Sequence, residues 1–512
     1  MNEQATAEHK VGLIIGALMI AMLMSSLGQM IFSTALPTIV GELGGVNHMS
    51  WVITAFLLGQ TIALPIFGKL GDQMGRKGLF LFVVILFMLG SLAGGLATSM
   101  SLLIAARAVQ GIAGGGLMIL SQSITAEVVS ARERGKYMGL MGSVFGVSSV
   151  LGPVLGGWFT DGPGWRWGLW LNIPLGLAAL VGAMLFLKLP HRKRVGRFDF
   201  LGTIFMALAT TCLILFVTWG GHEYDWDSPT ILGLIAGTLL FGAVFIIVEL
   251  RVPQPIVPMV LFKNRNFVLT TIAGLCIGIF MFGALGYLPT YLQMVHSLTP
   301  TAAGLMMTPM MVGLMGTSIL TGNLVTRTGK YKYFPIVGLL IVAVGMFLLS
   351  QLTVTDSLIQ VGFDFFIFGV GLGSAMQIIV LIVQNSFPIT LVGTATGANN
   401  FFRQIGGSLG AALVGGLFVG RLSDGLHEKV PAALQSMGAA AAPFAEQFAG
   451  GAGNQKLTPA LVTGFPEPLQ LAIQTAYNDA LTPIFLVLLP LAVFSAAVLV
   501  AVREEKLKET IS

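Results

Sequence analysis

Gly68-Lys69-Leu70-Gly71-Asp72-Gln73-Met74-Gly75-Arg76-Lys77 is a short polar run in an otherwise apolar part of the sequence. An apolar window over 51–70 leads into it, and another over 78–98 follows it. A membrane-spanning helix needs about 20 mainly apolar residues, because the bilayer core has no water to bond the backbone. The run is therefore predicted to be a tight turn between two membrane spans, with glycines that allow the bend.

The whole chain has the composition of a polytopic membrane protein. Of its 512 residues, 55% are hydrophobic and 10% are charged, whereas a soluble protein carries about 25% charged residues. Fourteen windows can span a membrane: 11–33, 51–70, 78–98, 101–124, 136–160, 168–188, 199–219, 229–249, 267–288, 302–323, 334–351, 357–383, 396–419 and 480–501. We expect an all-α polytopic membrane protein with 14 transmembrane helices. Both cysteines, Cys212 and Cys276, fall within spans, so no disulfide framework is expected.

The basic residues predict how these spans are oriented. With the N-terminus inside, the inward segments hold 21 of the 27 lysines and arginines. The outward segments hold Arg166, Arg421, Lys429 and Lys456. Cytoplasmic loops carry an excess of positive charge, so we expect both termini in the cytoplasm and a multi-pass protein in the inner membrane of a bacterium.

The chain divides into three predicted parts. Residues 1–198 contain six spans and end in a strongly basic inward stretch, residues 199–266 contain two more spans and a cytoplasmic loop, and residues 267–512 contain six. The last part includes an extracellular segment at about 420–479, rich in Ala, Gly and Pro, for which we expect short surface helices and turns. A degenerate copy of the opening turn at 322–330 supports the six-plus-six division.

The opening turn matches the signature loop of the major facilitator superfamily, Gly-x-Leu-x-Asp-x-x-Gly-Arg-Lys. Several other segments agree: Arg107, Gln110 and Gly111 in the fourth window, Gly139, Gly152-Pro153 and Gly156-Gly157 in the fifth, Trp165-Arg166-Trp167 before Asn172-Ile173-Pro174-Leu175-Gly176, and Arg403 with Gly406-Gly407. Together they resemble the fourteen-span drug:proton antiporter branch. The resemblance implies a major facilitator fold, with two six-helix bundles and two extra helices.

Three residues are candidates for proton coupling. A charged side chain within a span is costly, so Arg107 needs a cavity or a partner; a structural arginine that ties helix ends by hydrogen bonds is the alternative. Asp364 is the best embedded carboxylate, and Glu127 lies at the inner end of its span, where a gating salt bridge is the alternative. The branch commonly has Leu-Asp-x-Thr in its first span, but this chain has Leu27-Gly28 there. The usual acid is therefore replaced.

A second set of residues is expected to control the conformational change. Asp72 can accept hydrogen bonds from a helix N-terminus or from nearby arginines, and small residues at four-residue spacing let helices pack closely. The candidates are Gly68, Asp72, Gly75, Arg76, Gly152, Pro153, Gly156 and Arg403. For Arg403, near the inner end of its predicted span, an interhelical clamp is the alternative.

Polar residues inside the spans are the candidates for a substrate cavity, because polar groups in a membrane usually face the bundle interior. They are Gln29, Gln60, Gln122, Gln377, Asn399 and Asn400. The 25 Met and 34 Phe residues would suit an adaptable apolar pocket.

These features together predict a secondary active transporter, a multidrug antiporter that exports amphipathic small molecules against protons by alternating access. It would use no cofactor or metal, act as a monomer among membrane lipids and bind no nucleic acid. The alternative within transport is an exporter of a specific metabolite, peptide or lipid-like compound. An integral-membrane enzyme or a receptor is a further alternative; all six histidines fall in loops or tails and no paired carboxylates appear, which disfavours an enzyme.

Overall fold

The computed structural model describes residues 2–44, 48–189, 196–221, 223–438, 444 and 457–507. Most of the basic stretch that was predicted to close the first part, at 190–195, lies outside these residues. Helices of the first part are α1 Asn2–Leu43, α2 Met49–Met74, α3 Arg76–Gly95, α4 Met100–Val128, α5 Arg134–Asp161, α6 Arg166–Trp170 and α7 Asn172–Phe186. The two extra helices are α8 Phe200–Trp219 and α9 Pro229–Arg251, followed by the 3-10 helix η2 Met259–Lys263.

The last part is also helical. Its elements are α10 Arg265–Val295, α11 Pro300–Met306, α12 Thr308–Thr328, α13 Tyr333–Ser350, α14 Leu358–Asn385, α15 Val392–Met437, α17 Pro459–Thr463 and α18 Glu467–Val500. Within the described residues, 14 helical segments are long and apolar enough to cross a membrane, with α6–α7 and α11–α12 each forming one of them. The predicted fold class and number of spans are confirmed.

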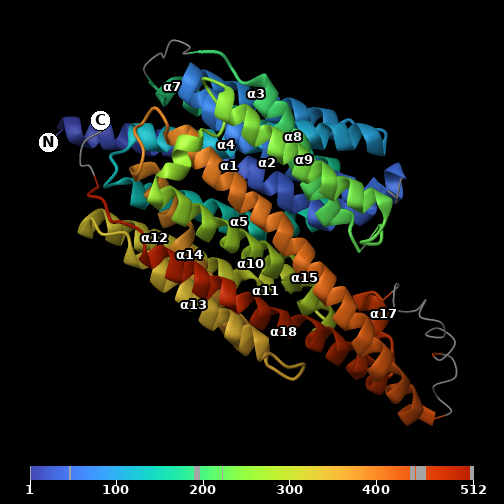
Figure 1. Ribbon diagram of the computed structural model, residues 1–512. Coiled ribbons are helices and arrows are strands. Elements are labelled where there is room, and N and C mark those ends of the chain that lie inside the picture. The colour runs from blue at the N-terminus through green and yellow to red at the C-terminus, as the bar shows by residue number, and fades with distance from the viewer. Residues whose placement is uncertain are drawn as a thin grey trace.

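The outward segment at 420–479 differs from its prediction. Instead of short surface helices throughout, α15 continues to Met437 and α18 already begins at Glu467. In Figure 1 the two helices project together beyond the rest of the molecule. They pack on each other through buried apolar residues such as Leu426, Val430 and Ile473. This packing stabilises the helical turns that lie outside the predicted apolar windows. Pro443 lies outside the described residues.

Three sets of helices pack mainly within themselves (Figure 1). The first set is α1–α7, and the second is α10–α18. The third is the α8–α9 hairpin, in which very few residues of α9 are buried and α8 contacts α2 and α15. A helix that is apolar on every side can face lipid, so this peripheral place suits α9.

The two ends of the molecule differ in charge. Both basic turns, at 75–77 and 329–332, lie at the end where α1 begins and where residues 503–505 bond to Asn266, Tyr331 and Asn385. We refer to it as the basic end. At the opposite end Glu42 accepts hydrogen bonds from Arg166 at 2.6 Å and Trp165 at 2.7 Å. These bonds, with Arg166 first, lower the pKa of the Glu42 carboxyl.

Candidate functional site

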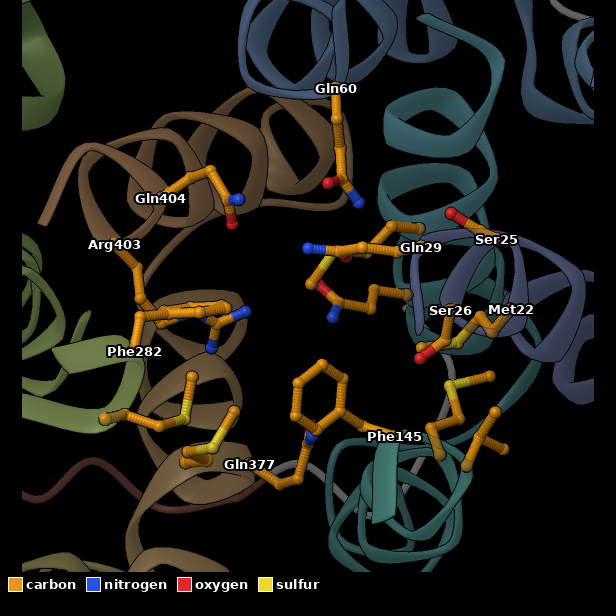
Figure 2. A pocket seen from close by; sticks show the side chains of 16 residues that line it. Met22, Ser25, Ser26, Gln29, Gln60, Phe145, Phe282, Gln377, Arg403 and Gln404 are labelled. Atoms are coloured by element: carbon orange, nitrogen blue, oxygen red, sulfur yellow. The ribbon is translucent and has the colours of Figure 1, made fainter. Parts of the chain in front are cut away.

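Two adjoining cavities lie between the first and second helix sets. The narrow cavity has a volume of about 80 Å³, and Figure 2 shows the side chains that line it. The wide cavity has a volume of about 440 Å³ and extends from it toward the opposite end. Gln29, Phe145, Phe282 and Gln404 line both cavities, so the two cavities adjoin each other.

Four of the six predicted cavity residues line the narrow cavity: Gln29, Gln60, Gln122 and Gln377. They come from α1, α2, α4 and α14, so both helix sets contribute amides to one space. The Oε1 atoms of Gln60 and Gln377 are buried without a hydrogen-bond partner in the described structure.

Asn399 and Asn400 are placed elsewhere. They are not among the lining residues of either cavity. The Asn399 amide donates to the Thr271 hydroxyl at 3.2 Å, and the Asn400 amide donates to Gln122 Oε1 at 2.7 Å. Both therefore fasten α15 to a neighbouring helix rather than face the cavity.

At the basic end, Asp72 joins the two helix sets. This residue accepts hydrogen bonds from the backbone N–H groups of Gly393 and Thr394 at 3.1 and 2.7 Å and from the Thr394 hydroxyl at 2.8 Å. The first N–H groups of a helix have no partner within it and carry partial positive charge. Asp72 thus caps α15 across the boundary between the two helix sets, and both contacts predicted for it are present.

Arg76 extends this contact. It pairs with Asp72 and with Glu127, each at 2.8 Å, and it donates to the carbonyl of Ile389 at 2.9 Å. Glu127, a candidate for proton coupling, is therefore ion-paired within the closure. Gly75 permits the turn between α2 and α3, because its φ of 89° is strained for any residue with a side chain.

The degenerate turn makes a related contact on the other side of the basic end. Arg132, between α4 and α5, donates to the carbonyl of Thr326 at 3.1 Å. Two glycines, Gly135 and Gly322, bring the α5 and α12 backbones together: a Cβ at Gly322 would stand 2.2 Å from the Gly135 carbonyl oxygen. Gly68 does the same for α2 and α15, where a Cβ would stand 2.5 Å from the carbonyl oxygen of Gly393. Close backbone contact thus joins the two helix sets at two places on the basic end.

The comparisons with known proteins agree with this geometry. The family model described as "Major Facilitator Superfamily" matches residues 18–411.

The chain belongs to the major facilitator superfamily.

Curated relatives cover most of this transporter. An MFS-type transporter of Mycobacterium tuberculosis is 37% identical over 97% of this chain and 70% of the relative. The multidrug transporter protein MdtP of Bacillus subtilis is 36% identical over 86% of this chain and 82% of its own. Multidrug resistance protein 3 of the same organism is 31% identical over 100% of this chain and 98% of its own.

A solved structure has the same fold. The human organic anion transporter MFSD10 aligns with a TM-score of 0.61 at 13% sequence identity, over 94% of this chain and 99% of its own. At that identity the similarity concerns the fold alone. The protein is a transporter of this superfamily and not an enzyme.

Arg107 of the transporter is buried away from both cavities. Its guanidinium donates to the carbonyls of Gly28 and Val52 and to Gln110, and it lies 4.1 Å from the ring centre of Phe32. It ties α1, α2 and α4 together. The Gly28 position, where the branch usually has an acid, packs on Phe87, which an added Cβ would approach to 3.2 Å.

Asp364 of the transporter is buried in α14 and accepts a hydrogen bond from Gln360 at 3.2 Å. It makes no ion pair with a described residue, and it lines neither cavity.

The remaining predicted gating residues of the transporter lie on α5 and α15. Gly152 packs on Met30 of α1, Gly156 is buried in the same helix, and Pro153 lines the wide cavity.

Arg403 was expected near the inner end of its span. Because α15 begins four residues before the predicted window, Arg403 instead stands three turns into the helix, on the wall of the narrow cavity.

Other residues of the wall were not predicted. They include Ser25, Ser26 and Gln404, the rings of Phe145 and Phe282, and five methionines: Met22, Met118, Met141, Met281 and Met376. Gln404 is polar within a predicted span and could have been found by that rule. The aromatic and methionine residues could not, because apolar side chains that face lipid look the same in the sequence.

Proposed function

We propose that this transporter exports amphipathic small molecules by proton-coupled antiport and alternating access. The observation that supports it most is the cavity between the two helix sets, which is lined by amides, methionines and two phenylalanines and is sealed at one end. Amides can orient a polar group of a substrate, and flexible apolar side chains can pack against substrates of different shapes. The names of the two Bacillus relatives support a multidrug substrate range; an exporter of one metabolite, peptide or lipid-like compound is the alternative.

In this proposal the basic end faces the cytoplasm of a bacterial inner membrane, and both termini lie there. The reason is the excess of positive charge in the turns at this end. The structure then corresponds to the state in which the cytoplasmic side is closed and the cavity extends outward. Export requires the Asp72 and Arg132 contacts to open, so that substrate can enter from the other side.

Asp364 is the proposed proton carrier. Antiport needs a carboxyl group that can change its protonation state within the membrane. Asp72 and Glu127 are both paired with Arg76, and Glu249 accepts two backbone N–H bonds from Ile256 and Val257. Asp364 has only the neutral Gln360 as a partner among the described residues, so it can bind and release a proton without breaking an ion pair.

Everted vesicles that contain the full chain test the proposal. An imposed acid-inside gradient should drive the uptake of a lipophilic dye, and adding that dye should release protons from the vesicles. Asp364→Asn should abolish proton release while keeping the chain in the membrane. The matched control is Asp356→Asn, in the turn before α14, which should behave as the wild type.

Unchanged proton release in Asp364→Asn would remove this residue from the mechanism. Dye uptake without proton release in the wild type would contradict antiport, and dye binding without any uptake would indicate a receptor.

A further inference from the structure

One buried cation faces the narrow cavity. Arg403 is 7% exposed, and it is the one charged side chain among the described residues that line either cavity. Its side chain extends from α15 into the space that the labelled side chains of Figure 2 surround. No carboxylate of the described residues pairs with it. Among the described residues, this positive charge in the cavity therefore has no counter-ion.

The base of this side chain is held firmly. The carbonyl of Arg403 would lie 2.1 Å from a Cβ at Gly278, so α10 and α15 touch through their backbones at this point. The backbone of Arg403 is packed against α10, and its long side chain extends to the cavity. A guanidinium held in this way can bond a carboxylate, sulfonate or phosphate through two parallel N–H donors.

We propose that the cavity selects amphipathic molecules that carry an anionic group, and that Arg403 binds this group. A buried charge is costly unless it is paired, and an anionic substrate would supply the missing partner. A cationic substrate would meet the opposite situation, since it would add a like charge where no acid neutralises it.

The shapes of the two cavities fit such a molecule. Arg403 lines the narrow cavity but not the wide one. The narrow cavity, of about 80 Å³, can hold a small charged group beside Gln377 and Gln404. The wide cavity, of about 440 Å³, can hold an apolar body against Phe282, Leu285 and Met311. This orientation places the anionic end deep and the apolar end toward the opposite end of the molecule.

A matched pair of fluorescent probes tests the inference. 8-Anilinonaphthalene-1-sulfonate and N-phenyl-1-naphthylamine share one aromatic body, and only the first has a sulfonate. Binding of each would be measured to the full chain in lipid nanodiscs, with empty nanodiscs as the blank. Arg403→Gln should weaken binding of the sulfonate about 10- to 100-fold, as expected for the loss of a charged hydrogen bond. The affinity for the neutral probe should change by less than about twofold, which is less than the loss of one hydrogen bond would cause.

Two further variants separate charge from packing. Arg403→Lys keeps the charge and should retain most of the sulfonate binding, although it loses the two parallel donors. Arg421→Gln makes the same substitution at an exposed position of the same helix and should bind both probes as the wild type does. The thermal stability of each variant would be measured beside its binding.

Equal weakening for both probes in Arg403→Gln would overturn the inference, since it would show that Arg403 only supports packing. Undiminished sulfonate binding, or no sulfonate binding by the wild type, would also overturn it. The inference relies on the proposed function only in taking this cavity as the substrate site. Charge selectivity without proton-coupled uptake would contradict antiport alone, and uptake without charge selectivity would contradict the role of Arg403 alone.

Discussion

At the scale of the residue, one carboxylate joins the two helix sets at the basic end. Asp72 belongs to α2, but three of its hydrogen bonds come from Gly393 and Thr394 at the start of α15. Its negative charge makes two favourable interactions. It pairs with the Arg76 guanidinium, and it is attracted by the partial positive charge at the N-terminus of α15. In the proposed mechanism, this contact has to break when the basic end opens.

Asp72→Asn should therefore favour the open basic end. The amide can still accept a hydrogen bond, but it loses the ion pair and the charge-dipole interaction, at a cost of about 1–3 kcal/mol, or about 5- to 150-fold in the ratio of the two states. Spin labels at Lys77 and Lys330, with Cys212 and Cys276 replaced by Ala, would report the separation of the two basic turns. The variant should populate a longer distance.

The control for this experiment is Glu133→Gln, which removes an exposed charge at the same end. It should leave the distance distribution as in the wild type. If Asp72→Asn gives that same distribution too, Asp72 does not hold the basic end closed.

At the scale of the element, the closure depends on how near two helices can come. Gly68 of α2 faces the carbonyl of Gly393, and Gly397 of α15 faces the carbonyl of Leu64, where an added Cβ would stand 2.6 Å from the oxygen. Small residues allow this backbone contact in a membrane, where packing rather than hydrophobic burial holds helices together. The α2–α15 pair can close fully because neither surface carries a side chain at the crossing.

Gly68→Val should keep α2 and α15 apart at the basic end. Overpacking of a tight contact costs about 1–3 kcal/mol, so the same spin-label pair should show a larger separated population and export should slow. Gly416→Val is the matched control, because a Cβ at that position of α15 meets no atom within 4 Å. A normal distance distribution in Gly68→Val would show that the helices adjust to the added side chain without separating.

At the scale of the whole molecule, the charge in the cavity bears on the energy that drives export. The central space contains a cation and no acid among the described residues, and the proposed proton carrier Asp364 lies outside it. Substrate and proton would then occupy separate places and be coupled through the motion of the helix sets. Whatever the number of exchanged protons, export of a substrate with one negative charge moves one more elementary charge across the membrane than export of a neutral substrate.

Uptake of the sulfonate probe into everted vesicles should therefore depend more steeply on membrane potential than uptake of its neutral analogue. One elementary charge across 100 mV corresponds to about 2.3 kcal/mol, which is roughly a 50-fold difference in the accumulation ratio. Potassium gradients with valinomycin would set the potential at constant pH. If uptake of both probes depends equally on membrane potential, the sulfonate does not cross the membrane as an anion.

Much of the architecture could be predicted from the sequence, because hydropathy is a local property of about 20 residues. The fourteen spans, the ion pair between Asp72 and Arg76 and four of the glutamines on the cavity wall follow from such local patterns. The ends of α15 and α18 could not be predicted in this way. Their extensions are held by contacts between residues that lie further apart than one such window, as Lys429 and Asp479 do.

The sequence by itself determined that this chain spans a membrane fourteen times and carries a few polar groups inside it. Only the tertiary structure decided which way those groups face. It turned Arg403 into the cavity, tied Arg107 to the carbonyls of α1 and α2, and fastened Asn399 to Thr271. The physical reason is that a helix apolar on nearly every side has no stripe to fix its rotation, so packing between helices sets it.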